Sequence, residues 1–126
     1  MIKRHFELVR EDIAKSEWLI EHINVKSEYD EDNNIGIIGG SLRFRDGSVF
    51  HFREVFVGEV RRYRFHYMDR ENNMIFRWDN APHHRNLSTF PHHVHLPDGV
   101  RESGEVMFSE VLHRIEDIVI GSLDED

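Results

Sequence analysis

Histidines gather in one segment of this chain. Residues 78–96, WDNAPHHRNLSTFPHHVHL, hold five of its ten histidines and contain two Pro-His-His triplets that begin at Pro82 and Pro91. Histidine titrates near neutral pH, so it can donate or accept a proton in catalysis, and its neutral ring also binds metals. A single histidine most often makes ordinary hydrogen bonds. Five within 13 residues, with arginine and aspartate nearby, indicate a functional site instead.

The run 90–96 alternates in the way a β-strand does. His93 and His95 then point to one side of the strand, and His92 points to the other. A His-x-His pair on one face can supply a general acid and a general base, or two ligands of a metal ion. Two further histidines, His83 and His84, fall in a loop, where functional groups are often placed.

The hairpin 60–79 places more polar groups on one surface. Pairing Phe65 with Trp78 and Tyr67 with Phe76 makes one face aromatic and the other polar, whereas a slip of one residue would mix them. In this register the polar face carries Arg62, Arg64, His66, Arg77 and Asp79.

Glu54 lies in an aromatic row with Phe50, Phe52 and Phe56. A carboxylate among aromatic rings is costly unless it is paired or used. Two interpretations remain open. Glu54 reaches solvent at the strand end, or a bulge turns it towards the basic cluster, where it orients a histidine or pairs an arginine.

Composition narrows the class of protein. A chain of 126 residues with 39% hydrophobic and 11% aromatic residues is expected to form a single domain, residues 1–126. The absence of cysteine excludes disulfides and thiolate zinc sites and fits a reducing cytoplasm. The N-terminal residues MIKRHFELVRED do not read as a signal peptide, and no apolar run approaches about 18 residues, so we expect no membrane span.

Charge is unevenly distributed along the chain, whose net charge is −8. Residues 61–96 carry 6 basic and 3 acidic groups together with six histidines, while residues 97–126 carry 2 basic and 9 acidic groups. The net charge of the chain argues against general nucleic-acid binding, but a local positive segment can still steer an anion into a cleft.

The hydrophobic pattern predicts an α+β fold with an N-terminal helix, an antiparallel β-meander of five or six strands and a C-terminal helix. One sheet face is expected to be covered by the helices and the other to be partly open to water. The expected helices span 4–22 and 107–119, with Gly121 as a stop. The expected strands are 25–29, 48–57, 60–68, 74–79 and 90–96, with one more in two short pieces, 35–38 and 42–45, around a bulge or bend at Gly39-Gly40. Asp69 is expected to pair with Met74.

Three segments, FREVFV, YRFHYMDRENNMIFRWDNAPHH and TFPHHVHLPDG, resemble the TumE family of toxin–antitoxin proteins. The match is close over residues 50–96, and the flanking helices fit in outline. The resemblance implies a small cytoplasmic toxin whose partner antitoxin is often a helix-turn-helix DNA-binding protein. The family positions fall on Glu54, Tyr63, Arg64, His66, Arg77, Asp79, Asn80, Pro82, His83, His84, Pro91, His92, His93 and His95.

Many small toxins act on RNA, and these residue types suit metal-independent RNA cleavage. That reaction needs a base for the 2′-hydroxyl, an acid for the leaving oxygen and cations for the phosphorane. His66 or His93 is the candidate base, and His95 or His83 the candidate acid. The expected catalytic residues are Glu54, Arg64, His66, Arg77, Asp79, His83, His93 and His95. The expected substrate-binding residues are Arg62, Asn80, His84 and His92, with no metal or cofactor.

Two other functions remain open. His93 and His95 with one of His66, His83 or Asp79 could bind zinc or manganese and activate a water, although no diagnostic metal motif is present. Alternatively, the chain is a non-enzymatic module that binds its antitoxin or a phosphorylated ligand. Pro91 places strand 90–96 at a sheet edge, where a homodimer could form.

Overall fold

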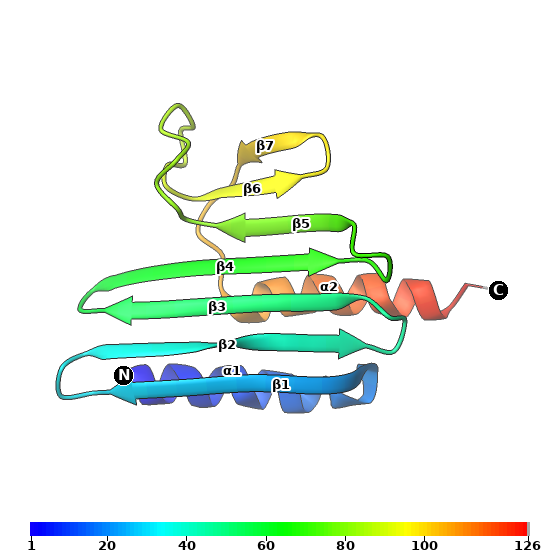
Figure 1. The fold of residues 1–126 in the computed structure, drawn as a ribbon, viewed down its shortest axis with the longest axis horizontal. Helices are drawn as coiled ribbons and strands as arrows, with labels where there is room; N and C mark the ends of the chain where they lie inside the picture. The colour runs from blue at the N-terminus through cyan, green and yellow to red at the C-terminus, as the bar shows by residue number, and fades with distance from the viewer. Residues whose placement is uncertain (126) are drawn as a thin grey trace.

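The computed structural model describes residues 1–125 as one antiparallel sheet of seven strands with a helix before it and a helix after it (Figure 1). The strands are adjacent in chain order, so the sheet is a simple meander. The elements are α1 (Ile2–Lys15), a 3₁₀ turn η1 (Glu17–Leu19), β1 (Ile20–Asp30), β2 (Ile35–Phe44), β3 (Val49–Val57), β4 (Val60–Met68), β5 (Met74–Asp79), β6 (His93–Leu96), β7 (Gly99–Glu102) and α2 (Phe108–Leu123). The expected α+β architecture is confirmed, with seven strands in place of five or six.

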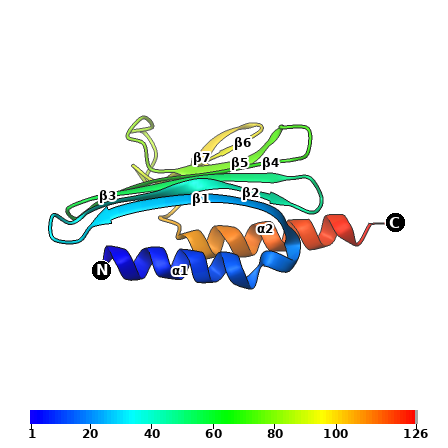
Figure 2. The same cartoon turned by 60° about the horizontal axis from the view of Figure 1, so that its bottom comes forward.

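Both helices lie on the same face of the sheet, behind β1 to β4, and β5 to β7 extend past them (Figures 1 and 2). The apolar residues of α1 recur at helical spacing, as Ile2, Phe6, Val9 and Ile13, and all four are buried. None of the helices within residues 1–125 combines the length and apolarity needed to cross a membrane.

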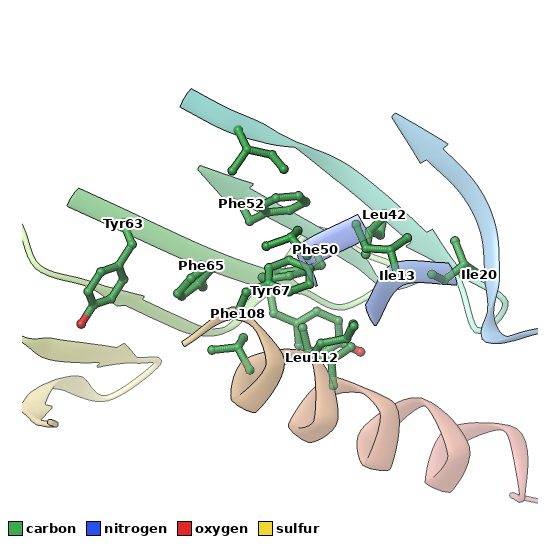
Figure 3. Close-up of a cluster of buried hydrophobic side chains, with 14 of the residues drawn as sticks. Ile13, Ile20, Leu42, Phe50, Phe52, Tyr63, Phe65, Tyr67, Phe108 and Leu112 are labelled. Atoms are coloured by element: carbon green, nitrogen blue, oxygen red, sulfur yellow. The ribbon is translucent and has the colours of Figure 1, made fainter. Parts of the chain in front are cut away.

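The core is largely aromatic (Figure 3). Phe108 at the start of α2 contacts Phe50, Phe52 and Phe65 of the sheet, with ring centroids 5.9, 4.8 and 6.3 Å away. Each fully buried side chain of this size contributes about 1.5–3 kcal/mol through removal of apolar surface from water. This packing decides which face of the sheet receives the helices and leaves the polar face open.

Several expected boundaries were wrong. Helix α1 ends at Lys15, because the chain turns at Ser16 and uses the consecutive buried residues Leu19 and Ile20 to enter β1. The expected break at Gly39-Gly40 is instead continuous strand β2. At Gly40 φ is +152°, and an added Cβ would collide with the backbone of Asn24, so glycine allows β1 to pass close by.

The predicted register of β4 and β5 is confirmed over four pairs. Arg64 faces Asp79, Phe65 faces Trp78, His66 faces Arg77, and Tyr67 faces Phe76. The pairing of Asp69 with Met74 is wrong, since Met74 pairs with Met68 across a bulge. The Asp69 carboxylate instead accepts hydrogen bonds from the backbone N–H groups of Glu71 and Asn73, which closes the turn.

The strand containing His93 and His95 is not an edge strand. β6 pairs with β5 on one side and with β7 on the other, and β7 was not expected from the sequence. The two edges of the sheet are β1 and β7. The homodimer expected through residues 90–96 therefore loses its structural basis.

Glu54 does not reach solvent and does not turn towards the basic cluster of the open face, but it does pair an arginine and contact a histidine, on the covered face. It stays on the helix-covered face with no exposed surface. Arg61 Nη2 donates to Glu54 Oε1 at 2.7 Å, and His5 Nε2 lies 2.9 Å from Oε2. Burial alone raises the pKa of Glu54, but the hydrogen bonds from His5 and Arg61 and the Arg61 charge outweigh burial and leave this pKa below its ordinary value.

We expect Arg61→Met to lower the free energy of unfolding at pH 7 by about 3–5 kcal/mol, because it removes the arginine charge and leaves the buried Glu54 carboxylate with His5 alone. Urea denaturation measures this loss. The double variant Glu54→Leu/Arg61→Met should lose less, since no unpaired charge remains.

The loss of unfolding free energy in Arg61→Met should also depend on pH. The folded-state pKa of Glu54 lies below its unfolded value of 4.5. The stability that ionised Glu54 contributes to the folded protein is therefore complete above pH 4.5. It is lost as the pH falls through the lower folded-state pKa of Glu54. A single variant as stable as the double variant at pH 7 would contradict this account.

Candidate functional site

Strands β5 and β6 bring four of the expected residues together. Asp79 is the cross-strand partner of His93, and Arg77 is the partner of His95. Because side chains alternate along a strand, all four lie on the open face. They line a hollow of about 440 Å³, together with Arg53, Val55, Arg62, Tyr63, Arg64, Asn80, Ala81, His83 and His84.

His93 is held in one orientation at the floor of this hollow. Its Nδ1 lies 2.9 Å from the carbonyl oxygen of Pro91, which only accepts, so Nδ1 carries a hydrogen. Its Nε2 lies 2.8 Å from Asp79 Oδ1 and 3.1 Å from His95 Nε2. A bare nitrogen lone pair facing a carboxylate oxygen would be repelled. The geometry therefore favours an imidazolium that donates from both nitrogens, or a cation shared by these atoms.

His95 differs from His93, because its Nε2 accepts a hydrogen bond. Its Nε2 lies 3.3 Å from Nη2 of Arg77, which can only donate, so this nitrogen acts as an acceptor. Burial and the charge of Arg77 lower the pKa of His95 from its ordinary value of 6.5, and the nearby Asp79 opposes them in part. His95 is therefore a neutral base at pH 7, and its Nε2 lies 3.1 Å from that of His93.

Asp79 connects these groups and is itself fixed. The carboxylate is buried, Ala81 N donates to Oδ1 at 3.0 Å, and Arg77 Nε donates to Oδ2 at 3.3 Å. His95 Nε2 lies 3.4 Å from the same Oδ2. One carboxylate therefore orients both histidines and the guanidinium of Arg77.

The loop between β5 and β6 supplies a third histidine. The ring of His84 lies 4.7 Å from that of His93 and 5.5 Å from that of His95. Ligand nitrogens of these three rings all lie within 4.8 Å of one another, a spacing that one metal ion could close. The neighbouring His83 also lines the hollow and is exposed.

Three arginines of β3 and β4 that line the hollow have no carboxylate partner among residues 1–125. Arg53, Arg62 and Arg64 are exposed, and none forms an ion pair with a carboxylate within residues 1–125. Sequence reasoning placed Arg62 and Arg64 here but missed Arg53. Extending the same alternation argument to β3 would have found it, since Arg53 is the partner of Arg64.

Three of the expected residues lie outside the hollow: Glu54, which is on the covered face, His66 and His92. His66 shares the open face but faces Arg77 from β4, outside the hollow, and its buried Nδ1 has no hydrogen-bond partner within residues 1–125. Burial, then the charges of Arg77, His51 and Arg64, lower the pKa of His66. His92 points to the other face, where its Nδ1 lies 2.7 Å from the Tyr63 hydroxyl.

Asn80 lines the hollow, but its side chain serves the fold. Its Oδ1 accepts from Tyr63 N at 2.9 Å, and its Nδ2 donates to the carbonyl of Arg61 at 2.8 Å. Both bonds tie the chain after β5 to the backbone of β4. The Asn80 side chain therefore holds the backbone beside the hollow, and its expected substrate binding stays a prediction.

The fold and the hollow together define a small α+β protein with a histidine and arginine site on the free face of a meander sheet. Residues 7–121 match the family model described as Toxin TumE, which covers most of the chain. The chain belongs to the TumE toxin family, and this membership implies an antitoxin partner. No curated protein and no solved structure gives a significant match.

We expect Arg77→Gln to raise the pKa of His95 towards 6.5, because the variant removes a positive charge that disfavours the imidazolium. Titration of the His95 Cε1 proton by NMR measures the shift. Arg43→Gln is the control, since Arg43 lies on the same sheet face but on β2, away from the hollow. A His95 pKa above 6.5 in the unmodified protein would contradict the assignment of a neutral base.

Proposed function

We propose that this toxin cleaves the phosphodiester bonds of RNA in the hollow on the open face. One observation supports the proposal above all others. A neutral His95 lies beside Asp79 and His93, and the wall of the hollow carries arginines that no carboxylate of residues 1–125 neutralises. RNA supplies both its own nucleophile, the 2′-hydroxyl, and the negative charge that unpaired arginines attract.

His95 is the general base in this proposal. Its acceptor nitrogen takes the proton of the 2′-hydroxyl as that oxygen attacks the adjacent phosphorus. The resulting imidazolium lies 3.4 Å from Asp79 Oδ2, which stabilises the new charge. A base of lowered pKa remains unprotonated at neutral pH, so its full population is available for the reaction.

The general acid comes from the loop. The Nε2 atoms of His93 and His95 are 3.1 Å apart, too close to lie on opposite sides of one phosphorus. An in-line displacement needs the acid on the far side, next to the leaving oxygen. His83 or His84 takes this role, whereas the buried His93 acts as a positioning residue that fixes Asp79 and His95.

The arginines hold the substrate. Arg62 and Arg64 project beside each other from β4, and Arg53 lies opposite Arg64 on β3. A guanidinium binds phosphate oxygens in bidentate fashion and binds them more strongly as the phosphorane gains charge. Arg77 differs, because its contacts with Asp79 and His95 already engage it.

Metal-dependent hydrolysis is a second candidate, and one observation favours it. The nitrogens of His84, His93 and His95 converge, and Asp79 Oδ1 lies 2.8 Å from His93 Nε2, as ligands around one small cation would. The hydrogen bond from His93 Nδ1 to Pro91 O is the kind that orients a metal-bound imidazole. Zinc in such a site would activate a water molecule.

We expect the purified protein to cleave total RNA in the presence of EDTA, and His95→Ala to slow cleavage by about 10²–10⁴-fold through loss of the base. Gel analysis of the products measures the rates. His113→Ala, an exposed histidine of α2, is the matched control and should keep full activity.

Three outcomes separate the candidates. Cleavage that EDTA abolishes and zinc or manganese restores would favour the metal-dependent route. Absence of cleavage in every condition would refute RNA cleavage altogether. Toxicity that persists after replacement of His83, His84, His93 and His95 would favour a non-enzymatic binding module.

The partner we propose is a basic, helix-turn-helix DNA-binding antitoxin in the cytoplasm. Support comes from the family and from charge, because residues 97–126 carry 9 acidic and only 2 basic groups. An interface steered by charge weakens as salt screens the charges.

We therefore expect the dissociation constant of the complex with the protein encoded by the adjacent gene to rise with ionic strength in calorimetry. A salt-independent affinity would argue against a charge-steered partner.

A further inference from the structure

A second hollow lies beside the first on the open face. It has a volume of about 470 Å³ and shares two lining residues, Arg53 and Arg64, with the histidine site. Lys26 of β1 bounds it on the other side. The expected functional residues of the sequence did not include Lys26 or this surface.

The register of the sheet places lining residues of both hollows in one continuous row. Neighbouring strands pair Lys26 with Gly39, Gly39 with Arg53, Arg53 with Arg64, Arg64 with Asp79 and Asp79 with His93. These residues form one row across six strands on one face. At a strand spacing of ~4.8 Å the row is about 24 Å long.

Gly39 leaves space at the bottom of the second hollow. Gly39 has no side chain to raise between Lys26 and Arg53, and a Cβ at this position would lie 2.8 Å from the carbonyl oxygen of Phe52. The next residue, Gly40, also lines the hollow. A ligand can therefore lie against the backbone of β2, with a cation on either side.

The charge of this row is unusual for the protein. The chain has a net charge of −8, yet Lys26, Arg53 and Arg64 form no ion pair with a carboxylate of residues 1–125. Glu28 is the one acidic residue among those lining the second hollow. Three uncompensated cations in a row suit a chain of phosphates better than a single anion.

We infer that the second hollow is a binding subsite for the backbone of single-stranded RNA, which extends across the sheet from the bond to be cleaved at His95 to Lys26. This inference rests on the proposed RNA cleavage. The length of the row corresponds to about 4 nucleotides, the short end of single-strand binding sites. The open-face positions of β2 to β4 carry no Phe, Tyr or Trp, so the subsite holds phosphates and does not select bases.

Binding and cleavage of short and long substrates test the subsite. The binding probe is a fluorescent hexanucleotide with 2′-O-methyl groups, which cannot be cleaved through its 2′-oxygen, and fluorescence anisotropy gives its dissociation constant. We expect Lys26→Glu to weaken this binding about five- to tenfold. The slope of log Kd against log salt should fall by about 0.7 for each phosphate that the variant no longer neutralises. Cleavage of a dinucleotide, which fills only the histidine site, should be unchanged.

Lys15→Glu is the matched control, because it makes the same charge change at an exposed position at the end of α1. Equal hexanucleotide binding by the two variants would overturn the subsite, as would an equal effect of Lys26→Glu on the dinucleotide. A Glu-rich decapeptide that binds as tightly as the hexanucleotide would overturn it in favour of a protein ligand. Hexanucleotide binding that needs Lys26 without any cleavage would refute the proposed reaction and leave the subsite standing.

Discussion

The pairing of β5 with β6 is the constraint on which the site depends. It sets Asp79 opposite His93 and Arg77 opposite His95, so that one buried carboxylate contacts two imidazoles and a guanidinium. A shift of one residue in this register would send the same side chains to the aromatic face. β7 extends the sheet beyond β6, which makes the strand carrying the histidines internal.

The two faces of the sheet have different roles. The covered face packs aromatic rings against α1 and α2 and holds one buried ion pair, Glu54 with Arg61. The open face carries the row of residues from Lys26 to His93, which is polar in every strand from β1 to β6 except at Gly39 of β2. Because the aromatic residues of β3, β4 and β5 set the alternation, the same pattern that builds the core also directs the arginines and histidines outward.

The local charge of each sheet face depends on which arginines project from that face. Arg61 is neutralised on the covered face by Glu54 and Glu105. Arg62 and Arg64 project from the other face of β4 and remain without carboxylate partners among residues 1–125. A protein with an overall negative charge therefore presents unpaired cations on one surface, and such a local positive charge favours the approach of an anion there.

By itself, the sequence determined the fold class, the family resemblance, the β4–β5 register and the side of the strand from which His93 and His95 project. These depend on period-two alternation and on local motifs, which act over a few residues. Only the tertiary structure decided the partner of Glu54, the internal position of β6, the displacement of His66 from the site and the approach of His84. Each of these depends on contacts between segments distant along the chain, such as His5 with Glu54, and alternation within one strand carries no information about which distant segment packs against it.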